Sequence, residues 1–231
     1  MHLKIAPSII SADFSILQEE VQEVEKSGAD LLHIDVYPLL VWGFEYRRLG
    51  RMMIGPLLVE VLKNHTRLPL DVHLAIEVSD DVIRRYVRAG SDIITVHAEA
   101  CAHPERVIRM IKDQGLKAGI ALNPATPLSL VKPYLTDLDL ILLMTTSANF
   151  GGLDFTADTI PKIRMAATMR KRHRSMLDIE VDGSVDCKSA PKLVAAGANV
   201  LVAGGAIFGE KDYAIAIRKL RHACRRKLNT R

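Results

Sequence analysis

Cysteine, aromatic side chains and long apolar runs are all scarce in this chain of 231 residues. Its 3 cysteines are odd in number and far apart, which excludes a disulfide framework and predicts a reducing compartment such as the cytoplasm. No apolar run reaches the roughly 18 residues of a transmembrane helix. Residues 1–8 have the pattern of a strand and lack the basic and apolar regions of a secretory signal. We therefore expect neither export nor a membrane partner.

Charge of one sign is only slightly in excess, because 31 Lys and Arg stand against 27 Asp and Glu. The basic excess lies largely in residues 169–174 and 218–231, and no aromatic residue interrupts either run. Proteins that bind single-stranded nucleic acid combine such charge with aromatic side chains on which bases stack. The two runs are therefore interpreted as a solvated helix face and a frayed terminus, and no nucleic-acid partner is expected.

Short β-branched segments alternate with longer amphipathic segments along the whole chain. Strands are predicted at residues 3–6, 31–36, 70–74, 93–96, 118–122, 138–144, 177–181 and 200–202. Helices are predicted at residues 15–26, 55–64, 80–88, 104–114, 128–135, 158–173, 189–196 and 213–227. Four helix-to-strand joints carry a glycine, which can adopt the left-handed conformation that ends a helix: Gly28, Gly90, Gly115 and Gly197.

This alternation predicts an α/β fold. Eight strand–helix units in about 230 residues are typical of a (β/α)₈ TIM barrel. A doubly wound open sheet is the alternative. No linker or shift in composition divides the chain, so we expect a single barrel domain over residues 1–231.

Polar residues stand at the ends of several predicted strands, where a barrel has its open mouth. His33 and Asp35 lie two residues apart on one strand, so their side chains share a face. His73 ends the third strand and Asp182 the seventh. Two histidines and two aspartates at one mouth suit a divalent transition metal. Taken singly, each is more often a hydrogen-bonding or turn residue, and His97, at the end of the fourth strand, is less favoured as a ligand.

Glycine pairs follow the last three predicted strands, at residues 151–152, 183–184 (glycine then serine) and 204–205. Backbone N–H groups at helix starts attract anions, and glycine lets a phosphate approach closely. Barrels often bind phosphate beside strands seven and eight. Any one pair could be an ordinary turn, but their joint placement favours a phosphate site.

Six stretches of the chain, in the right order, resemble the ribulose-phosphate 3-epimerases of the pentose phosphate pathway. They are residues 5–14 (IAPSIISADF), 33–36 (HIDV), 70–74 (LDVHL), 122–127 (LNPATP), 180–183 (EVDG) and 196–208 (AGANVLVAGGAIF). The resemblance implies a ribulose-phosphate-binding type of barrel. It also implies an isomerase that inverts carbon 3 of D-ribulose 5-phosphate to give D-xylulose 5-phosphate.

The resemblance assigns roles to individual residues. It implies one divalent metal ion (zinc, iron, manganese or cobalt) held by His33, Asp35, His73 and Asp182. Asp35 and Asp182 would be the catalytic acid–base pair, passing a proton through an enediolate. The implied contacts to a small phosphorylated sugar are Ser8, His73, Asn149, Phe150, Gly151, Gly152, Gly183, Ser184, Gly204 and Gly205. Family members form dimers or larger rings, so a homo-oligomer is expected.

The chain departs from the family pattern mainly around the sugar. Residues 37–54 are longer than the usual segment and unlike it, and Ala75 and Ser184 replace a usual methionine and glycine. Two alternatives stay open on this ground. The barrel could act on another ketose phosphate, such as allulose 6-phosphate. It could also be non-catalytic and bind a sugar phosphate or a protein.

Overall fold

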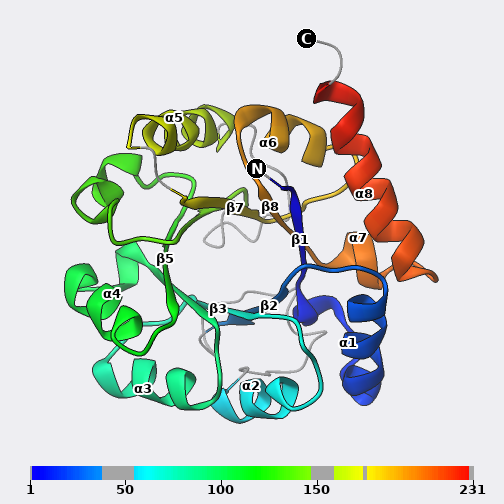
Figure 1. The fold of residues 1–231 in the computed structure, drawn as a ribbon, viewed down its shortest axis with the longest axis horizontal. Coiled ribbons are helices and arrows are strands. Elements are labelled where there is room, and N and C mark those ends of the chain that lie inside the picture. The colour runs from blue at the N-terminus through cyan, green and yellow to red at the C-terminus, as the bar shows by residue number, and fades with distance from the viewer. Residues whose placement is uncertain (1, 38–54, 147–158, 174–175, 229–231) are drawn as a thin grey trace.

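The computed structural model describes residues 2–37, 55–146, 159–173 and 176–228. Within these ranges eight strands form one parallel sheet, and Figure 1 shows the helices arranged in a ring around it. The strands are β1 (Lys4–Pro7), β2 (Leu32–Val36), β3 (Leu70–Leu74), β4 (Ile93–His97), β5 (Lys117–Leu122), β6 (Leu140–Met144), β7 (Asp178–Asp182) and β8 (Val200–Ala203). The predicted (β/α)₈ barrel is thus confirmed.

The helices follow the strands in alternation. The α-helices are α1 (Leu17–Lys26), α2 (Pro56–Lys63), α3 (Asp80–Arg88), α4 (Pro104–Lys112), α5 (Thr159–Arg172), α6 (Ala190–Ala196), α7 (Gly205–Phe208) and α8 (Tyr213–Leu228). The 3₁₀ helices are η1 (Ile9–Ser11), η2 (Phe14–Ile16), η4 (Ala98–Ala100) and η5 (Leu128–Tyr134). No helix in these ranges combines the length and apolar character that a membrane crossing needs.

The barrel closes between its first two strands. The sheet runs β1-β8-β7-β6-β5-β4-β3-β2, and a parallel bridge between Ser8 and His33 joins its two ends. The side chain of Asp30 adds to this closure, because its Oδ2 accepts a 2.7 Å hydrogen bond from the Ile5 backbone N–H. Ser8, the residue after β1, is thereby held next to β2, the strand that carries His33 and Asp35.

Strand alternation separates two apolar clusters. Outward-facing residues such as Ile34 and Val181 pack with the helices in one large buried cluster. A smaller cluster contains the alternate residues of the same sheet, among them Leu142 and Val202. On β2, β3 and β7 the corresponding inner positions are polar, so one side of the barrel interior holds charged groups while the other is apolar.

One predicted helix has a different form in the structure, and several short helices were not predicted. Where a helix was predicted at residues 128–135, the 3₁₀ helix η5 (Leu128–Tyr134) forms instead of an α-helix, since Pro133 lies inside it and lacks the N–H that an α-helical bond needs. The short helix α7 was not predicted, because its four residues are too few to show a helical period. Neither difference moves a strand, so the barrel is unaffected.

Candidate metal centre and active site

Strands β2 and β3 place four polar side chains on one inner surface. In their parallel register His33 stands beside Asp71 and Asp35 beside His73. All four side chains are almost wholly buried. The intervening residues of both strands are apolar and face outward, so the two-residue period of a strand turns every polar side chain inward.

Four of the predicted site residues converge. His33, Asp35, His73 and Asp182 each offer a ligand atom, and these atoms all lie within 4.8 Å of one another. Asp35 is central, since its Oδ1 lies 3.2 Å from His33 Nε2 and 2.9 Å from His73 Nδ1. Asp182 reaches the cluster from β7.

The cluster fits a divalent metal ion. Two imidazoles and two carboxylates are the donors that such ions prefer. His73 Nδ1 is the ring nitrogen that lies beside Asp35, so it is the His73 atom placed to bind a metal ion. A metal held here would also neutralise the buried carboxylates, whose burial as unpaired charges is costly.

The two aspartates differ in protonation. Burial raises the pKa of Asp35, but the charge of His33 and hydrogen bonds from His33 and His73 outweigh it and hold that pKa well below its usual value. Burial and the nearby charge of Asp35 raise the pKa of Asp182 to about 7. Without a bound cation, Asp35 is therefore ionised while Asp182 can carry a proton near neutral pH, which is the pairing expected of a base and an acid.

The histidines differ as well. Burial lowers the pKa of His73 to about 4, with the positive charges of His97 and His33 adding to that effect. Burial would also lower the pKa of His33, but the charges of Asp35 and Asp71 raise it well above its usual value. Without a bound cation, the positive charge of this cluster therefore resides on His33.

Hydroxyl groups surround Asp35 and Asp182. Ser8 Oγ, a predicted substrate contact, donates a 2.8 Å hydrogen bond to Asp35 Oδ2. Tyr37 donates to Asp35 Oδ1 at 3.2 Å. Thr145 Oγ1 donates to the Asp182 carbonyl at 2.9 Å and also to that of Gly183. Tyr37 and Thr145 were not predicted, although both lie next to strand ends where a search for hydroxyl groups would have found them.

Sequence reasoning also missed Asp71 and Glu180. Both are fully buried, and they form a second cluster of possible ligands with His33. Burial and the charge of Asp71 raise the pKa of Glu180 well above its usual value. The signal was available, because each precedes a predicted ligand by two residues and therefore shares its strand face: Asp71 precedes His73, and Glu180 precedes Asp182.

The predicted phosphate residues are partly described. Gly183 and Ser184 adopt left-handed conformations with φ of +116° and +50°, and a Cβ on Gly183 would lie 2.5 Å from Thr146 Oγ1. Gly204 and Gly205 begin α7 directly after β8, the neighbour of β7. Asn149, Phe150, Gly151 and Gly152 lie outside the described residues.

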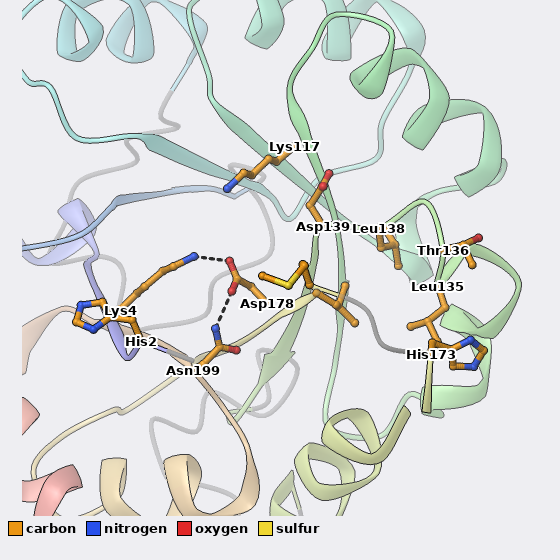
Figure 2. Close-up of a pocket in the computed structure, with 12 residues that line it drawn as sticks. His2, Lys4, Lys117, Leu135, Thr136, Leu138, Asp139, His173, Asp178 and Asn199 are labelled. Atoms are coloured by element: carbon orange, nitrogen blue, oxygen red, sulfur yellow. Dashed lines mark hydrogen bonds and ion pairs between the residues drawn. The ribbon is translucent and has the colours of Figure 1, made fainter. Parts of the chain in front are cut away.

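A pocket of about 640 Å³ lies at the opposite, amino-terminal end of the barrel. Figure 2 shows Lys4 and Asn199 pointing toward Asp178, and each lies 2.6 Å from that carboxylate. These polar groups satisfy one another, and TIM-barrel chemistry occurs at the other end of the strands. We therefore place the candidate active site at the His/Asp cluster.

Comparison with known proteins agrees with this geometry. The ribulose-phosphate 3 epimerase family matches residues 4–208. The ribulose-phosphate 3-epimerase of Bacillus subtilis (strain 168) is 47% identical over 220 residues, covering 95% of this chain and 98% of its own. That of Rhodospirillum rubrum is 42% identical, covering 96% and 94%.

Solved structures support the same fold. The 3-hexulose-6-phosphate synthase from Salmonella typhimurium superposes with a TM-score of 0.73 over 97% of this chain and 99% of its own, at 16% identity. At that identity the likeness concerns the fold alone. The family match and the two epimerase relatives go further, and by them this chain belongs to the ribulose-phosphate 3-epimerase family.

Proposed function

We propose that this chain inverts carbon 3 of D-ribulose 5-phosphate to give D-xylulose 5-phosphate, acting as a single domain over residues 1–231. The observation that carries the proposal is the convergence of Asp35 and Asp182 from β2 and β7 with opposite pKa shifts. Membership of the epimerase family supports the choice of reaction.

The chemistry needs one group to remove a proton and another to return one. Ionised Asp35 takes the proton from carbon 3, and the electron pair of the broken C–H bond moves toward the neighbouring carbonyl to form an enediolate. Protonated Asp182 then donates its proton to the opposite face of carbon 3. The reverse reaction exchanges these two roles.

His33, Asp35, His73 and Asp182 would hold the metal ion, which we propose to be zinc, iron, manganese or cobalt. When bound, such an ion supplies positive charge that stabilises the oxygen of the enediolate. Ser8 and His73, beside Asp35, would contact the sugar. We place the phosphate near residues 149–152, Gly183, Ser184, Gly204 and Gly205. A cytoplasmic homo-oligomer is the form in which we expect the enzyme to act.

The direct test is proton exchange at carbon 3. The metal-loaded protein is incubated with ribulose 5-phosphate in deuterated water, and the products are examined by NMR. We expect xylulose 5-phosphate with solvent deuterium at carbon 3. If ribulose 5-phosphate gives neither xylulose 5-phosphate nor deuterium at carbon 3, while allulose 6-phosphate does exchange its proton, the proposed substrate is wrong. If neither sugar exchanges, the barrel is non-catalytic.

Two variants test the roles of the aspartates. Asp35→Asn and Asp182→Asn remove an acid–base group at nearly constant shape, and each should lower kcat by about a hundredfold or more. Asp113→Asn makes the same change on the exposed end of α4 and serves as the matched control. Turnover within a factor of a few of the control in either site variant would contradict the assignment.

A further inference from the structure

A layer of buried polar groups lies one step deeper in the barrel than Asp35. His33, Asp71 and Glu180 each precede a residue of the candidate metal centre by two positions on the same strand, and all three are fully buried. Their place inside the barrel keeps them from direct contact with a substrate at the mouth. His33 is also one of the four candidate ligands, so Asp71 and Glu180 are the two groups whose effect on the reaction must pass through another residue.

His33 links the two layers through its two ring nitrogens. Nδ1 lies 2.8 Å from Asp71 Oδ2, and Nε2 lies 3.2 Å from Asp35 Oδ1 at the candidate metal centre. A carboxylate oxygen can only accept a hydrogen bond, so Asp71 requires Nδ1 to carry a proton. In a neutral imidazole this leaves the lone pair on Nε2, the nitrogen that faces Asp35.

We propose that Asp71 is the positioning residue that fixes the tautomer and ring orientation of His33, so that Nε2 is the atom offered to a metal ion. The inference rests on the proposed metal role of His33. Metal-binding histidines commonly donate their other N–H to a carboxylate, which raises the basicity of the ligand and holds the ring. Asp71 does so from the adjacent strand, in register with His33.

Glu180 is the less suitable partner. Its Oε1 lies 3.7 Å from His33 Nδ1, against 2.8 Å for Asp71 Oδ2. Only the shorter distance is a hydrogen bond.

The competing arrangement is a second cation bound between His33, Asp71 and Glu180, and it would need a lone pair on His33 Nδ1 instead of a proton. The two arrangements therefore predict opposite tautomers and different numbers of bound ions.

The first experiment uses the unaltered protein. Long-range proton–nitrogen NMR of the zinc-loaded chain, with His33→Gln used to assign the signals, reports which ring nitrogen carries the proton. We expect Nδ1 to be protonated and metal analysis to give one ion per chain. An Nε2-protonated His33, or two ions per chain, would overturn the proposal.

The second experiment measures metal affinity in Asp71→Asn by competition with a chelator. We expect zinc to bind about 10–100-fold more weakly than to the unaltered protein. Asp92→Asn is the matched control, because Asp92 accepts a 2.7 Å bond from the Leu70 backbone N–H at the other end of β3 and should affect folding without affecting zinc. Equal zinc affinity in Asp71→Asn and the control would contradict the inference.

These experiments can refute the role of Asp71 and the proposed function independently of each other. A protein that binds zinc with His33 in the expected tautomer but does not convert ribulose 5-phosphate would refute the substrate and leave the role of Asp71 intact. Conversely, an active enzyme whose zinc affinity is indifferent to Asp71→Asn would refute the positioning role alone. Should Asp71→Asn fail to fold, the tautomer measured in the unaltered protein still decides the question.

Discussion

A network of hydrogen bonds centred on Glu99 holds individual side chains at the mouth of the barrel. This glutamate follows β4, and its Oε2 lies 3.0 Å from His97 Nδ1, whose ring lies against His73. Its Oε1 accepts the Asn123 N–H at 2.9 Å and the Thr126 hydroxyl. Glu99 thus joins the candidate site to the loop after β5.

The pKa of Glu99 predicts how stability depends on pH. Burial raises this pKa, but hydrogen bonds from His97, Thr126 and the Asn123 backbone outweigh it and lower the pKa to about 2. Because the folded pKa is depressed, the stabilisation is complete above the unfolded value of about 4.5 and is lost as pH falls toward 2. After allowance for the partial exposure of Glu99, we expect this stabilisation to contribute about 1–2 kcal/mol to the free energy of unfolding.

The measurement compares Glu99→Gln with the unaltered protein in urea unfolding at pH 7 and pH 3. The variant should be less stable at pH 7 by this amount, and the difference should shrink at pH 3. The His97 imidazole and the Lys162 ammonium are the basic groups near Glu99, and His97→Gln shows how much of the effect depends on the imidazole. A pH-independent difference would refute the assignment.

Site residues were predictable from the sequence where their strand position revealed them. Asp35, His73 and Asp182 lie near the ends of their strands and His33 shares a strand face with Asp35, so strand position and alternation were enough to predict that the four meet at one mouth. Asp71 could not be paired with His33 in the same way, since the 2.8 Å contact depends on the register between β2 and β3. Register between parallel strands is set by the packing of whole strands and helices, not by local sequence.

Helices and strands are joined by glycines whose left-handed φ the sequence predicted. Gly28, Gly90, Gly115 and Gly197 all have φ between +76° and +120°. They differ in surroundings, which the sequence did not reveal. A Cβ on Gly197 would lie 2.4 Å from the Ala167 Cβ on α5, whereas one on Gly115 would meet no atom within 4 Å.

This difference predicts unequal costs for the same substitution. Gly115→Ala should destabilise by about 1 kcal/mol, the backbone cost of a left-handed alanine. Gly197→Ala should cost about 2–4 kcal/mol, because α5 and α6 must also move apart. Urea unfolding of both variants measures the difference, and equal losses would show that the contact with α5 relaxes freely.

Helix α3 illustrates how local signals define an element. Ser79 precedes it and its Oγ accepts the Val82 N–H at 3.4 Å, while Asp80 and Asp81 occupy the first turn, where negative charge is favourable. Ile83 and Tyr86 face inward and are buried. The helix 80–88 was therefore predicted with its observed bounds, whereas the 3₁₀ form of η5 depended on Pro133.

Across the barrel, the last helix secures the first strands. Figure 1 shows α8 beside α1 near the start of the chain. From α8, Arg221 donates to the carbonyls of Leu3 and Gly28 at 3.1 and 2.8 Å and to Asp30 Oδ2 at 2.7 Å. One arginine thus ties together the two ends of the sheet, where closure depends on few backbone bonds.

Replacement of Arg221 should lower the free energy of unfolding of the whole barrel. Arg221→Ala loses three hydrogen bonds from a partly buried guanidinium, and we expect a loss of about 1–3 kcal/mol in the free energy of unfolding. Arg218→Ala, at an exposed position on the same helix, is the control and should change stability by less than about 0.5 kcal/mol. Similar values for the two variants would show that Arg221 does not contribute to closure.

The fold class and the identity of the four candidate ligands were predictable from the chain alone, because strand periodicity, joint glycines and polar strand ends are local properties. Contacts between distant segments were not: the pairing of His33 with Asp71, the crowding at Gly197 and the closure by Arg221 all join residues far apart in sequence. Such contacts depend on the register and packing of complete strands and helices, which no local pattern specifies.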